Sequence, residues 1–303
     1  MRRFHTISAF HDFVQLPKPQ HPLLSVVNVG TVPPPPPGRA PESMVLDFYI
    51  ISVKRTRNVQ VKYGQHPFDF NEGVLSFIAP GQVFSVAVAD ENHAAEQSGW
   101  VVYLHPDFLW NTPLAKTIQQ YDFWDYSLRE ALFLSGKEEE AILSLVFAIE
   151  QEYTSTIDRF SKQIIVSHLE SLLHYADRFY NRQFITREKA NHEVLERLEM
   201  LLHTHFNSPD LPERGLPTVQ YVADQLHLSP KYLSNLLRVL TGQNTQQHIH
   251  AALIAKAKEK LSTTTLTVSE IAYGLGFEHL QSFSKLFKTK TSLSPLEFRA
   301  SFN

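Results

Sequence analysis

Hydrophobic and polar positions divide the chain into a strand-like first part and a helical remainder. Between residues 44 and 104, β-branched and aromatic residues form short runs separated by turn signals such as Ala79-Pro80-Gly81-Gln82. This pattern is typical of a small β-barrel or sandwich. The runs cover residues 45–53, 59–63, 74–78, 83–88 and 100–104.

After Pro106 the hydrophobic spacing changes to the helical period and predicts helices over residues 114–121, 137–153 and 158–180. The last of these carries an apolar stripe, which either packs in the core or forms the contact between two subunits. The stripe consists of Phe160, Ile164, Val166, Leu169, Leu172, Leu173 and Tyr175. The polar residues 181–191 are expected to link the two halves.

The first 45 residues are expected to be irregular. The segment Val32–Gly38 holds a run of prolines, and proline lacks the N–H that a helix or central strand requires. It predicts a polyproline II spacer or a surface loop, with a ligand for proline-recognising domains as the other interpretation. We therefore expect two domains, residues 1–185 with an irregular N-terminal arm and residues 186–303.

Two stretches of the helical part repeat each other, Val219–Gly242 and Val268–Ser292. Aligned pairs lie 49 residues apart at first, and 50 apart after one extra residue in the second copy. They include Val222 with Ile271, Ala223 with Ala272, Leu226 with Leu275, Leu233 with Phe283 and Leu237 with Phe287. Self-similarity at a fixed spacing indicates two copies of one supersecondary unit.

Each copy has the features of a helix-turn-helix. A small residue, Ala223 or Ala272, stands where a second helix must cross closely. Ser229 suits the N-cap of the next helix and Pro230 its first position, while Gly276 suits the turn of the second copy. The second helices have an apolar side, Leu233, Leu236 and Leu237 or Phe283, Leu286 and Phe287. Their opposite, polar side would be free to enter a major groove.

One helix, expected over Thr245–Leu261, joins the two copies. Its length of ~25 Å at 1.5 Å per residue would let both recognition helices reach successive major grooves, ~34 Å apart, if the DNA bends modestly. A helical scaffold without a DNA role is the alternative.

Charge changes this picture by its distribution. The whole chain has a net charge of −3, but residues 228–303 carry nine Lys or Arg against four acids, so this segment is +5 and the rest −8. A basic segment on an acidic body is typical of a DNA-binding module, although basic residues also decorate solvated helices. The chain has no cysteine, which excludes disulfides, thiolate zinc sites and cysteine nucleophiles and fits a cytoplasmic protein. No apolar run is long enough to predict a membrane span.

The repeat resembles the AraC/XylS family of transcription regulators over about residues 192–303. The second copy matches through Ile271-Ala272, Gly276-Phe277, Phe283-Ser284, Phe287-Lys288, Ser294-Pro295 and Phe298-Arg299. The first matches through Ala223, Leu228-Ser229-Pro230, Tyr232-Leu233-Ser234, Thr241-Gly242, Ala257 and Leu261. Two positions depart from the family pattern. Ser292 replaces a usual glycine in a turn that prefers positive φ, and Leu253 replaces a common arginine.

The resemblance implies base-reading positions on both recognition helices. In the first copy these are Lys231, Ser234 and Asn235, and in the second they are Leu280, Gln281 and Lys285. Asparagine and glutamine suit adenine, lysine suits guanine, and leucine offers only apolar contact, for instance to a thymine methyl. Phosphate contacts are expected from Ser229, Arg238, Ser282 and Lys288. For each of these the other interpretation is a solvated side chain.

The resemblance also implies an α+β chain in which a cupin-like β-barrel with trailing helices senses a small-molecule effector or mediates dimerisation. Expected partners are double-stranded DNA, RNA polymerase and a second copy of the chain, with no membrane, metal or cofactor. A DNA-binding protein without any ligand is a third interpretation.

A metal-dependent cupin enzyme is the rival interpretation. It would need a His-x-His pair near Lys54–Gln65, which the sequence lacks, and a later acid and histidine. His66, His93 and His105 are scattered over loops and strand ends. The pairs His203 with His205 and His248 with His250 have the spacing, but on predicted helices residues i and i+2 face apart. We therefore expect that the protein is not an enzyme.

Overall fold

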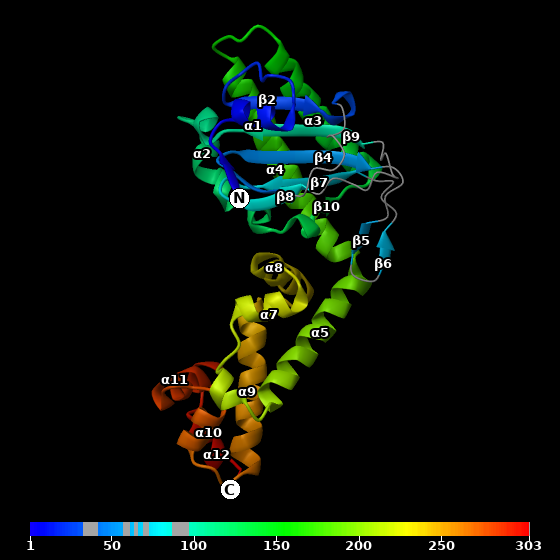
Figure 1. The fold of residues 1–303 in the computed structure, drawn as a ribbon. Helices are drawn as coiled ribbons and strands as arrows, with labels where there is room; N and C mark the ends of the chain where they lie inside the picture. The colour runs from blue at the N-terminus through cyan, green and yellow to red at the C-terminus, as the bar shows by residue number, and fades with distance from the viewer. Residues whose placement is uncertain (33–41, 57–60, 64–65, 69–72, 87–96, 303) are drawn as a thin grey trace. The chain divides into compact units, whose positions relative to one another are not determined.

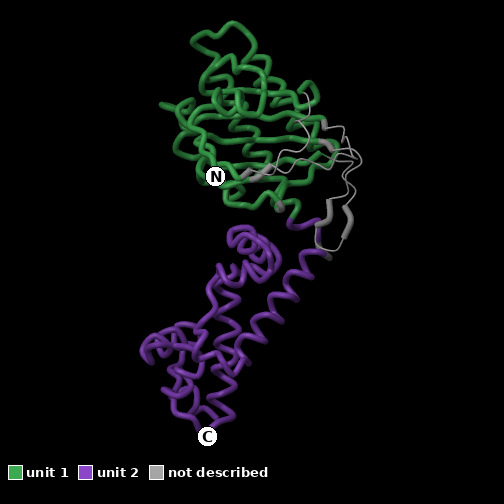
Figure 2. Tube along the Cα trace, in the orientation of Figure 1, with its two compact units in different colours: residues 1–183 green, residues 184–303 purple. Residues whose placement is uncertain are grey.

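The structure is a computed structural model, and it describes residues 1–32, 42–56, 61–63, 66–68, 73–86 and 97–302. The chain forms two compact units, Met1–Gln183 and Phe184–Asn303 (Figure 2). The first is a mixed α and β unit and the second is helical. Within the described residues, no helix is long and apolar enough to cross a membrane.

The strands in the described part of unit 1 form three sheets (Figure 1). A three-stranded sheet has the order β1-β3-β8, with β1 at Arg2–Phe4, β3 at Glu42–Leu46 and β8 at Val83–Val86. A five-stranded sheet has the order β10-β7-β4-β9-β2, with β10 at Leu132–Phe133, β7 at Val74–Ile78, β4 at Tyr49–Thr56, β9 at Gln97–Leu104 and β2 at Leu24–Asn28. The third sheet pairs β5 (Val61–Tyr63) with β6 (His66–Phe68).

The expectation of a closed barrel is therefore wrong for the described strands. The run expected as one strand over residues 45–53 is broken at Asp47 and Phe48, so that β3 and β4 belong to different sheets. Two features hold the chain at this break. The Asp47 amide donates to the carbonyl of Phe4 at 3.0 Å, and the Phe48 side chain is fully buried. Phe4 lies in β1, which extends the sheet that β3 has entered.

The first 45 residues are more ordered than their composition indicates. Besides β1 and β2 they contain helix α1 (Ile7–Val14) and a short 3-10 helix, η1 (Val29–Thr31). Thr6 caps α1 by accepting from the Ala9 amide at 3.2 Å. Ile7 and Phe10 then enter a core that both larger sheets line. The expectation of an irregular arm was wrong because such short elements give little periodicity. The proline run, residues 33–37, and His93 lie outside the described residues.

Helices follow the strands. Short 3-10 helices lie at Pro106–Leu109 (η2), Ile118–Gln120 (η3), Asp122–Asp125 (η4) and Leu128–Glu130 (η5), with α2 at Leu114–Thr117, α3 at Gly136–Thr154 and α4 at Ser161–Thr186. The apolar stripe expected on the last helix divides in two on α4. Val166, Leu169, Leu172 and Leu173 are buried, whereas Phe160, Ile164 and Tyr175 are 51%, 40% and 40% exposed.

The polar segment expected as a linker, residues 181–191, is helical. α4 runs to Thr186 and α5 (Glu188–Asn207) begins directly after it. Its polar side chains satisfy buried backbone groups: Gln183 accepts from the Phe133 amide at 2.9 Å, and Asn191 donates to the carbonyl of Phe184 at 2.6 Å. The polar composition of this segment suggested a linker. Two of its side-chain amides instead supply hydrogen bonds to backbone groups in the interior.

Unit 2 contains eight helices in the described residues. After α5 come α6 (Leu211–Arg214), α7 (Val219–Leu226), α8 (Pro230–Thr241), α9 (Thr245–Thr263), α10 (Val268–Gly274), α11 (Leu280–Thr291) and α12 (Pro295–Ala300). α5 packs against α7, α8 and α9. α6 forms one helical turn inside the proline-containing segment 207–217.

Candidate nucleic-acid interface

The first helix-turn-helix consists of α7 and α8. Thr218 caps α7 by accepting from the Tyr221 amide at 3.0 Å, and Ala223 is fully buried where α8 crosses. Between the helices, His227 adopts a left-handed conformation with φ 59°, and the Leu228 amide donates to the carbonyl of Ala223 at 3.0 Å. Ser229 then caps α8, accepting from the Tyr232 amide at 3.3 Å.

The second helix-turn-helix, α10 and α11, repeats this backbone pattern. The Phe277 amide donates to the carbonyl of Ala272 at 3.1 Å, and Gly276 takes the left-handed conformation with φ 84°. Phe277 and Gly276 each lie 49 residues after the corresponding residues of the first copy, Leu228 and His227. The N-caps of the two recognition helices, Ser229 and His279, lie 50 apart. The extra residue of the second copy is therefore in the turn, after Phe277.

The recognition helices also end alike. α8 ends at Gly242 with φ 73° and α11 at Ser292 with φ 63°, both left-handed. In each helix the last threonine, Thr241 or Thr291, donates to the carbonyl four residues before it at 2.8 Å. The prediction that Ser292 stands in a turn preferring positive φ is thus confirmed. An L-residue pays about 1–2 kcal/mol for this conformation, and glycine avoids that cost.

Helix α9 joins the two motifs and buries one side against both. At 19 residues it is about 28 Å long by its rise of 1.5 Å per residue. Leu253, at the position where the resemblance led us to expect an arginine, is fully buried. Ile249, Ala257 and Leu261 are buried along the same helix. Leu253 therefore contributes to the core of unit 2, where a charged side chain would need a partner.

The sequence-predicted contact residues divide by exposure. Lys231, Arg238, Gln281, Ser282, Lys285 and Lys288 are exposed, and Ser229, Ser234, Asn235 and Leu280 are half-buried. Six of these residues form two matching sets of three, one on each recognition helix. Each set occupies positions i, i+4 and i+7, which lie on one side of a helix. We call Lys231, Asn235 and Arg238 the recognition face of α8, and Gln281, Lys285 and Lys288 the recognition face of α11.

The two faces correspond residue by residue at the offset of 50, but their chemistry differs. The face of α8 presents lysine, asparagine and arginine, and the Arg238 guanidinium donates to the Asn235 amide oxygen at 3.3 Å. The face of α11 presents glutamine and two lysines. Opposite each face the helix is anchored by buried side chains, Leu233 and Leu237 in α8 and Phe283 and Phe287 in α11.

Ser234 has a partner inside the unit that sequence reasoning missed. Its hydroxyl lies 2.9 Å from the hydroxyl of Thr245, which is fully buried at the first turn of α9. This hydrogen bond ties α8 to the joining helix. A hydroxyl both donates and accepts, so the bond leaves room for a contact with DNA. The equivalent pair in the second copy is Ser284 and Pro295, and proline has no hydroxyl.

Three other predicted residues sit at helix starts. Ser229 uses its hydroxyl as the N-cap of α8. Leu280 and Ser282 lie in the first turn of α11, and the Ser282 amide donates to the carbonyl of His279 at 3.1 Å. Their counterparts in α8 at the offset of 50 are Pro230 and Tyr232, of which Tyr232 is buried. The two copies therefore differ most at the starts of their recognition helices.

A contact outside the two motifs positions the second one. His205 of α5 is buried and its Nε2 donates to the carbonyl of Gly215 at 3.0 Å, just after α6. A Cβ built on Gly276 would lie 2.9 Å from the Gly215 Cα. The turn of the second motif therefore rests on the α5–α6 connection. In the sequence, Gly215 is the residue that could have indicated this close backbone contact.

Acidic caps stabilise the helices of the second motif. Glu270 accepts from the Thr267 amide and Glu297 from the Ser294 amide, each at 2.7 Å. These backbone hydrogen bonds, joined by bonds to the two hydroxyls, hold the pKa of each carboxyl below its ordinary value. Both acids are thus used to hold α10 and α12, the helices on either side of α11 in the chain.

The chain was compared with known protein families and with curated proteins. Residues 222–301 match a protein family described as a helix-turn-helix domain. An uncharacterized HTH-type transcriptional regulator of Staphylococcus aureus is 28% identical over 141 residues, 46% of this chain and 17% of that protein. The uncharacterized HTH-type transcriptional regulator YfiF of Bacillus subtilis is 27% identical over 144 residues, 48% of this chain and 42% of that protein. The chain thus spans less than half the length of these curated relatives.

Two solved structures are each similar to about a third of the chain. The C-terminal domain of AraT, a response regulator from Geobacillus stearothermophilus, is 29% identical and covers 36% of this chain and 84% of its own, with a TM-score of 0.32. The DNA-binding domain of AdpA, solved with a target DNA, is 23% identical and covers 37% of this chain and 91% of its own, with a TM-score of 0.30.

Proposed function

We propose that the chain is a transcription regulator of the AraC/XylS family, and that it binds double-stranded DNA in a sequence-specific manner through α8 and α11. Each recognition helix would enter a major groove, and the joining helix α9 would set their spacing to successive grooves of one DNA face.

One observation carries the proposal. Two helices with buried apolar sides each present a polar side at positions i, i+4 and i+7, and the two sides correspond at the offset of 50. A scaffold helix needs no such correspondence, whereas a DNA reader needs a polar side chain at each of these positions. Asn235 and Gln281 can pair with adenine, and Lys231 and Lys285 with guanine. Leu280 would offer an apolar contact, and Ser234 would contact a base while holding Thr245.

We assign the affinity for DNA to contacts with its phosphates. Arg238 and Lys288 end the two recognition faces, and Ser229 and Ser282 lie at helix starts, where backbone amides also favour anions. Each phosphate that a cation neutralises releases counterions, so binding weakens with salt.

The salt dependence of binding tests this function. The full chain is titrated onto a duplex of mixed sequence at several salt concentrations by fluorescence anisotropy. We expect Arg238→Ala and Lys288→Ala each to lower the salt slope of log Kd by about one. Glu213→Gln, on the exposed turn of α6, is the matched control. Binding with the wild-type salt slope in both variants would contradict the phosphate assignment, and absence of binding would contradict the function.

We assign unit 1 to sensing a small-molecule effector and to forming a homodimer, with RNA polymerase as the further partner of the assembled regulator. The exposed residues of the stripe support the dimer: Phe160, directly before α4, and Ile164 and Tyr175 of α4. Sedimentation of the full chain should give a dimer that Ile164→Glu dissociates, and a monomer in the wild type would remove this assignment.

A further inference from the structure

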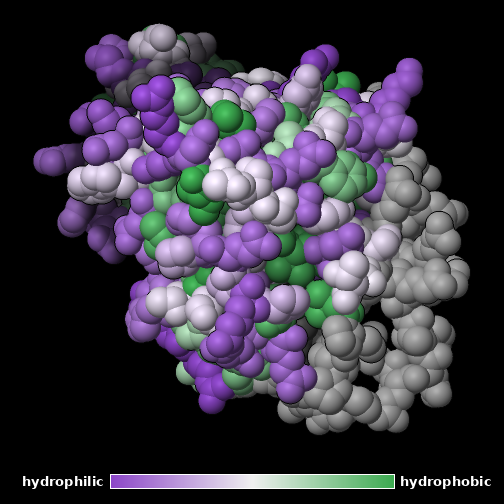
Figure 3. Space-filling view, turned by 90° about the horizontal axis from the view of Figure 1, so that it is seen from above, coloured by the Kyte–Doolittle hydropathy of each residue, from purple (hydrophilic) through white to green (hydrophobic). Residues whose placement is uncertain are grey.

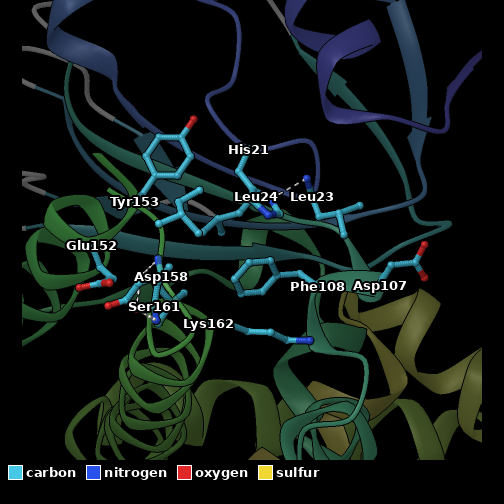
Figure 4. A pocket seen from close by; sticks show the side chains of 12 residues that line it. His21, Leu23, Leu24, Asp107, Phe108, Glu152, Tyr153, Asp158, Ser161 and Lys162 are labelled. Atoms are coloured by element: carbon cyan, nitrogen blue, oxygen red, sulfur yellow. Dashed lines mark hydrogen bonds between the residues drawn. The ribbon is translucent and has the colours of Figure 1, made fainter. Parts of the chain in front are cut away.

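The helical side of unit 1 contains a small pocket (Figure 4) of about 170 Å³. The chain around it comes from four places: the start of β2, η2, the end of α3 and the first turns of α4. Leu24, Phe108 and Ile165 form buried walls, and Tyr153 closes one side, its hydroxyl accepting from the Gln20 amide at 2.6 Å. The lining is therefore mainly apolar and held in place by the core.

The core between the two larger sheets of unit 1 is filled by side chains of the protein itself. Phe10 of α1 packs there against Phe48 and Tyr103, with ring centroids 6.0 and 5.6 Å apart. Met44 and Leu46 are buried in the same cluster. Among the described residues, the pocket on the α4 side lies apart from this cluster and is open to a ligand.

Size restricts the ligand. A cavity of about 150 Å³ lined by apolar side chains holds one benzene molecule. The pocket of about 170 Å³ therefore suits a single ring or a branched aliphatic body of similar size. The Phe108 ring contacts the His21 ring edge to face at 5.4 Å, so the pocket offers an aromatic surface that is already fixed.

Charge at the rim selects the polar group of that ligand. Figure 4 shows the carboxylates of Glu152 and Asp107 on opposite sides of Phe108, and the exposed Asp107 carboxylate also lies 3.5 Å from the Nδ1 of His105. The third acid, Asp158, is occupied as the cap of α4, accepting from the Phe160 amide at 2.7 Å. The cation of the rim, Lys162, donates to the carbonyl of Trp110 at 2.7 Å. Burial lowers the pKa of His21, which keeps that ring neutral at pH 7.

We propose that this pocket binds a compact organic amine, a cationic nitrogen on a ring-sized apolar body. The apolar body would lie against Phe108 and Ile165, and the ammonium would pair with Glu152 or Asp107. Aromatic rings at the same site add a cation–π attraction. The inference rests on the sensing role proposed for unit 1 and gives it a site and a ligand class.

The position of the pocket suits control of the other unit. Ser161, Lys162 and Ile165 belong to the first turns of α4, and the same helix continues to Thr186, beyond the boundary at residue 183. A ligand that orders the start of α4 therefore acts on a helix that is continuous with unit 2.

Hydrophobic residues form only small, separate patches on the face of unit 1 shown in Figure 3, so that face offers no broad apolar area.

Ligand-observed NMR titration of the full chain with benzylamine tests the proposal. Benzyl alcohol and benzoate, with the same ring and a neutral or anionic group, are the comparison probes. We expect benzylamine to bind at least about tenfold more tightly than either, a difference of about 1.4 kcal/mol. The Glu152→Gln/Asp107→Asn double variant should lose that preference, while Glu140→Gln, on the same helix α3 away from the pocket, should keep it.

Equal binding of the three probes, an unchanged preference in the double variant, or no binding of benzylamine would each overturn the proposal. DNA affinity is measured on the same preparations without any probe. Loss of the amine site with intact DNA binding contradicts this inference alone, and loss of DNA binding contradicts the proposed function.

Discussion

Gly276 and Gly215 pack backbone against backbone. A Cβ added to Gly276 would lie 2.9 Å from the Gly215 Cα and 3.0 Å from its carbonyl carbon, and φ at Gly276 is 84°. The turn of the second helix-turn-helix thus depends on a connection that lies before the first one, and Gly215 itself is held by His205. Residues outside the repeat therefore set the position of α11.

The close contact makes Gly276→Ala a strong test of this packing. We expect a loss of about 1–3 kcal/mol in the free energy of unfolding from the left-handed backbone, and a further loss from the overlap with Gly215. The matched control is Gly242→Ala, because Gly242 also has positive φ (73°) but open space around the new Cβ. Urea unfolding followed by circular dichroism should rank Gly276→Ala as clearly worse. Equal effects would mean that the backbone contact contributes nothing.

Ser292→Gly should stabilise the protein. Ser292 is exposed with φ 63°, and its counterpart in the first copy is already glycine. Relief of the left-handed strain, less the added freedom of glycine in the unfolded chain, leaves a gain of about 0.5–1 kcal/mol. The control Ser292→Ala keeps the strain and should give no gain. A destabilised Ser292→Gly protein in the same urea titration would argue against strain at this position.

Part of this account could be predicted from the sequence. The repeat and the joining helix followed from residue spacing, because helices with one buried side leave a strong periodic signal. The strained Ser292 followed from the family resemblance, which implies a glycine at that position. The barrel expectation was wrong because a continuous apolar run gives no sign of the break at Asp47. The tie between Ser234 and Thr245 could not be predicted, since a half-buried serine in a helix looks the same with or without a partner across the fold.

Ser234→Ala separates a positioning role from base reading. The substitution leaves the hydroxyl of Thr245 buried without its partner, and we expect a loss of about 1–3 kcal/mol in stability. Adding Thr245→Val should restore part of it. Ser284→Ala, the equivalent change beside Pro295, is the control and should cost less. If Ser234→Ala leaves stability unchanged and only relaxes sequence preference in DNA binding, Ser234 reads a base and its bond to Thr245 is incidental.

Unit 1 should lose stability in mild acid through His11. This ring is fully buried, its Nδ1 donates to the carbonyl of Pro17 at 2.6 Å, and burial lowers its pKa below the ordinary 6.5. Below that ordinary value the unfolded chain takes up a proton that the folded chain does not, so stability falls as pH falls. Above it this contribution is constant.

The three tryptophans, Trp100, Trp110 and Trp124, all lie in unit 1, so their fluorescence reports its unfolding. Urea midpoints of the wild type should decrease from pH 7.5 to pH 5.5, values chosen about one unit either side of the ordinary histidine pKa. His11→Gln should flatten this decrease, and His203→Gln, in unit 2, should not. An equally steep decrease in His11→Gln would assign the effect to another group.

Selection of binding sites from a random DNA pool by the full chain tests the central claim most directly. We predict an enriched site with two different sequence blocks about one helical turn, or 10 base pairs, apart, because the recognition faces of α8 and α11 differ in chemistry. Asn235→Ala should relax one block and Gln281→Ala the other, each costing about 1–3 kcal/mol on the wild-type site. A pool without enrichment, or one in which both variants relax the same block, would contradict the assignment of two separate readers.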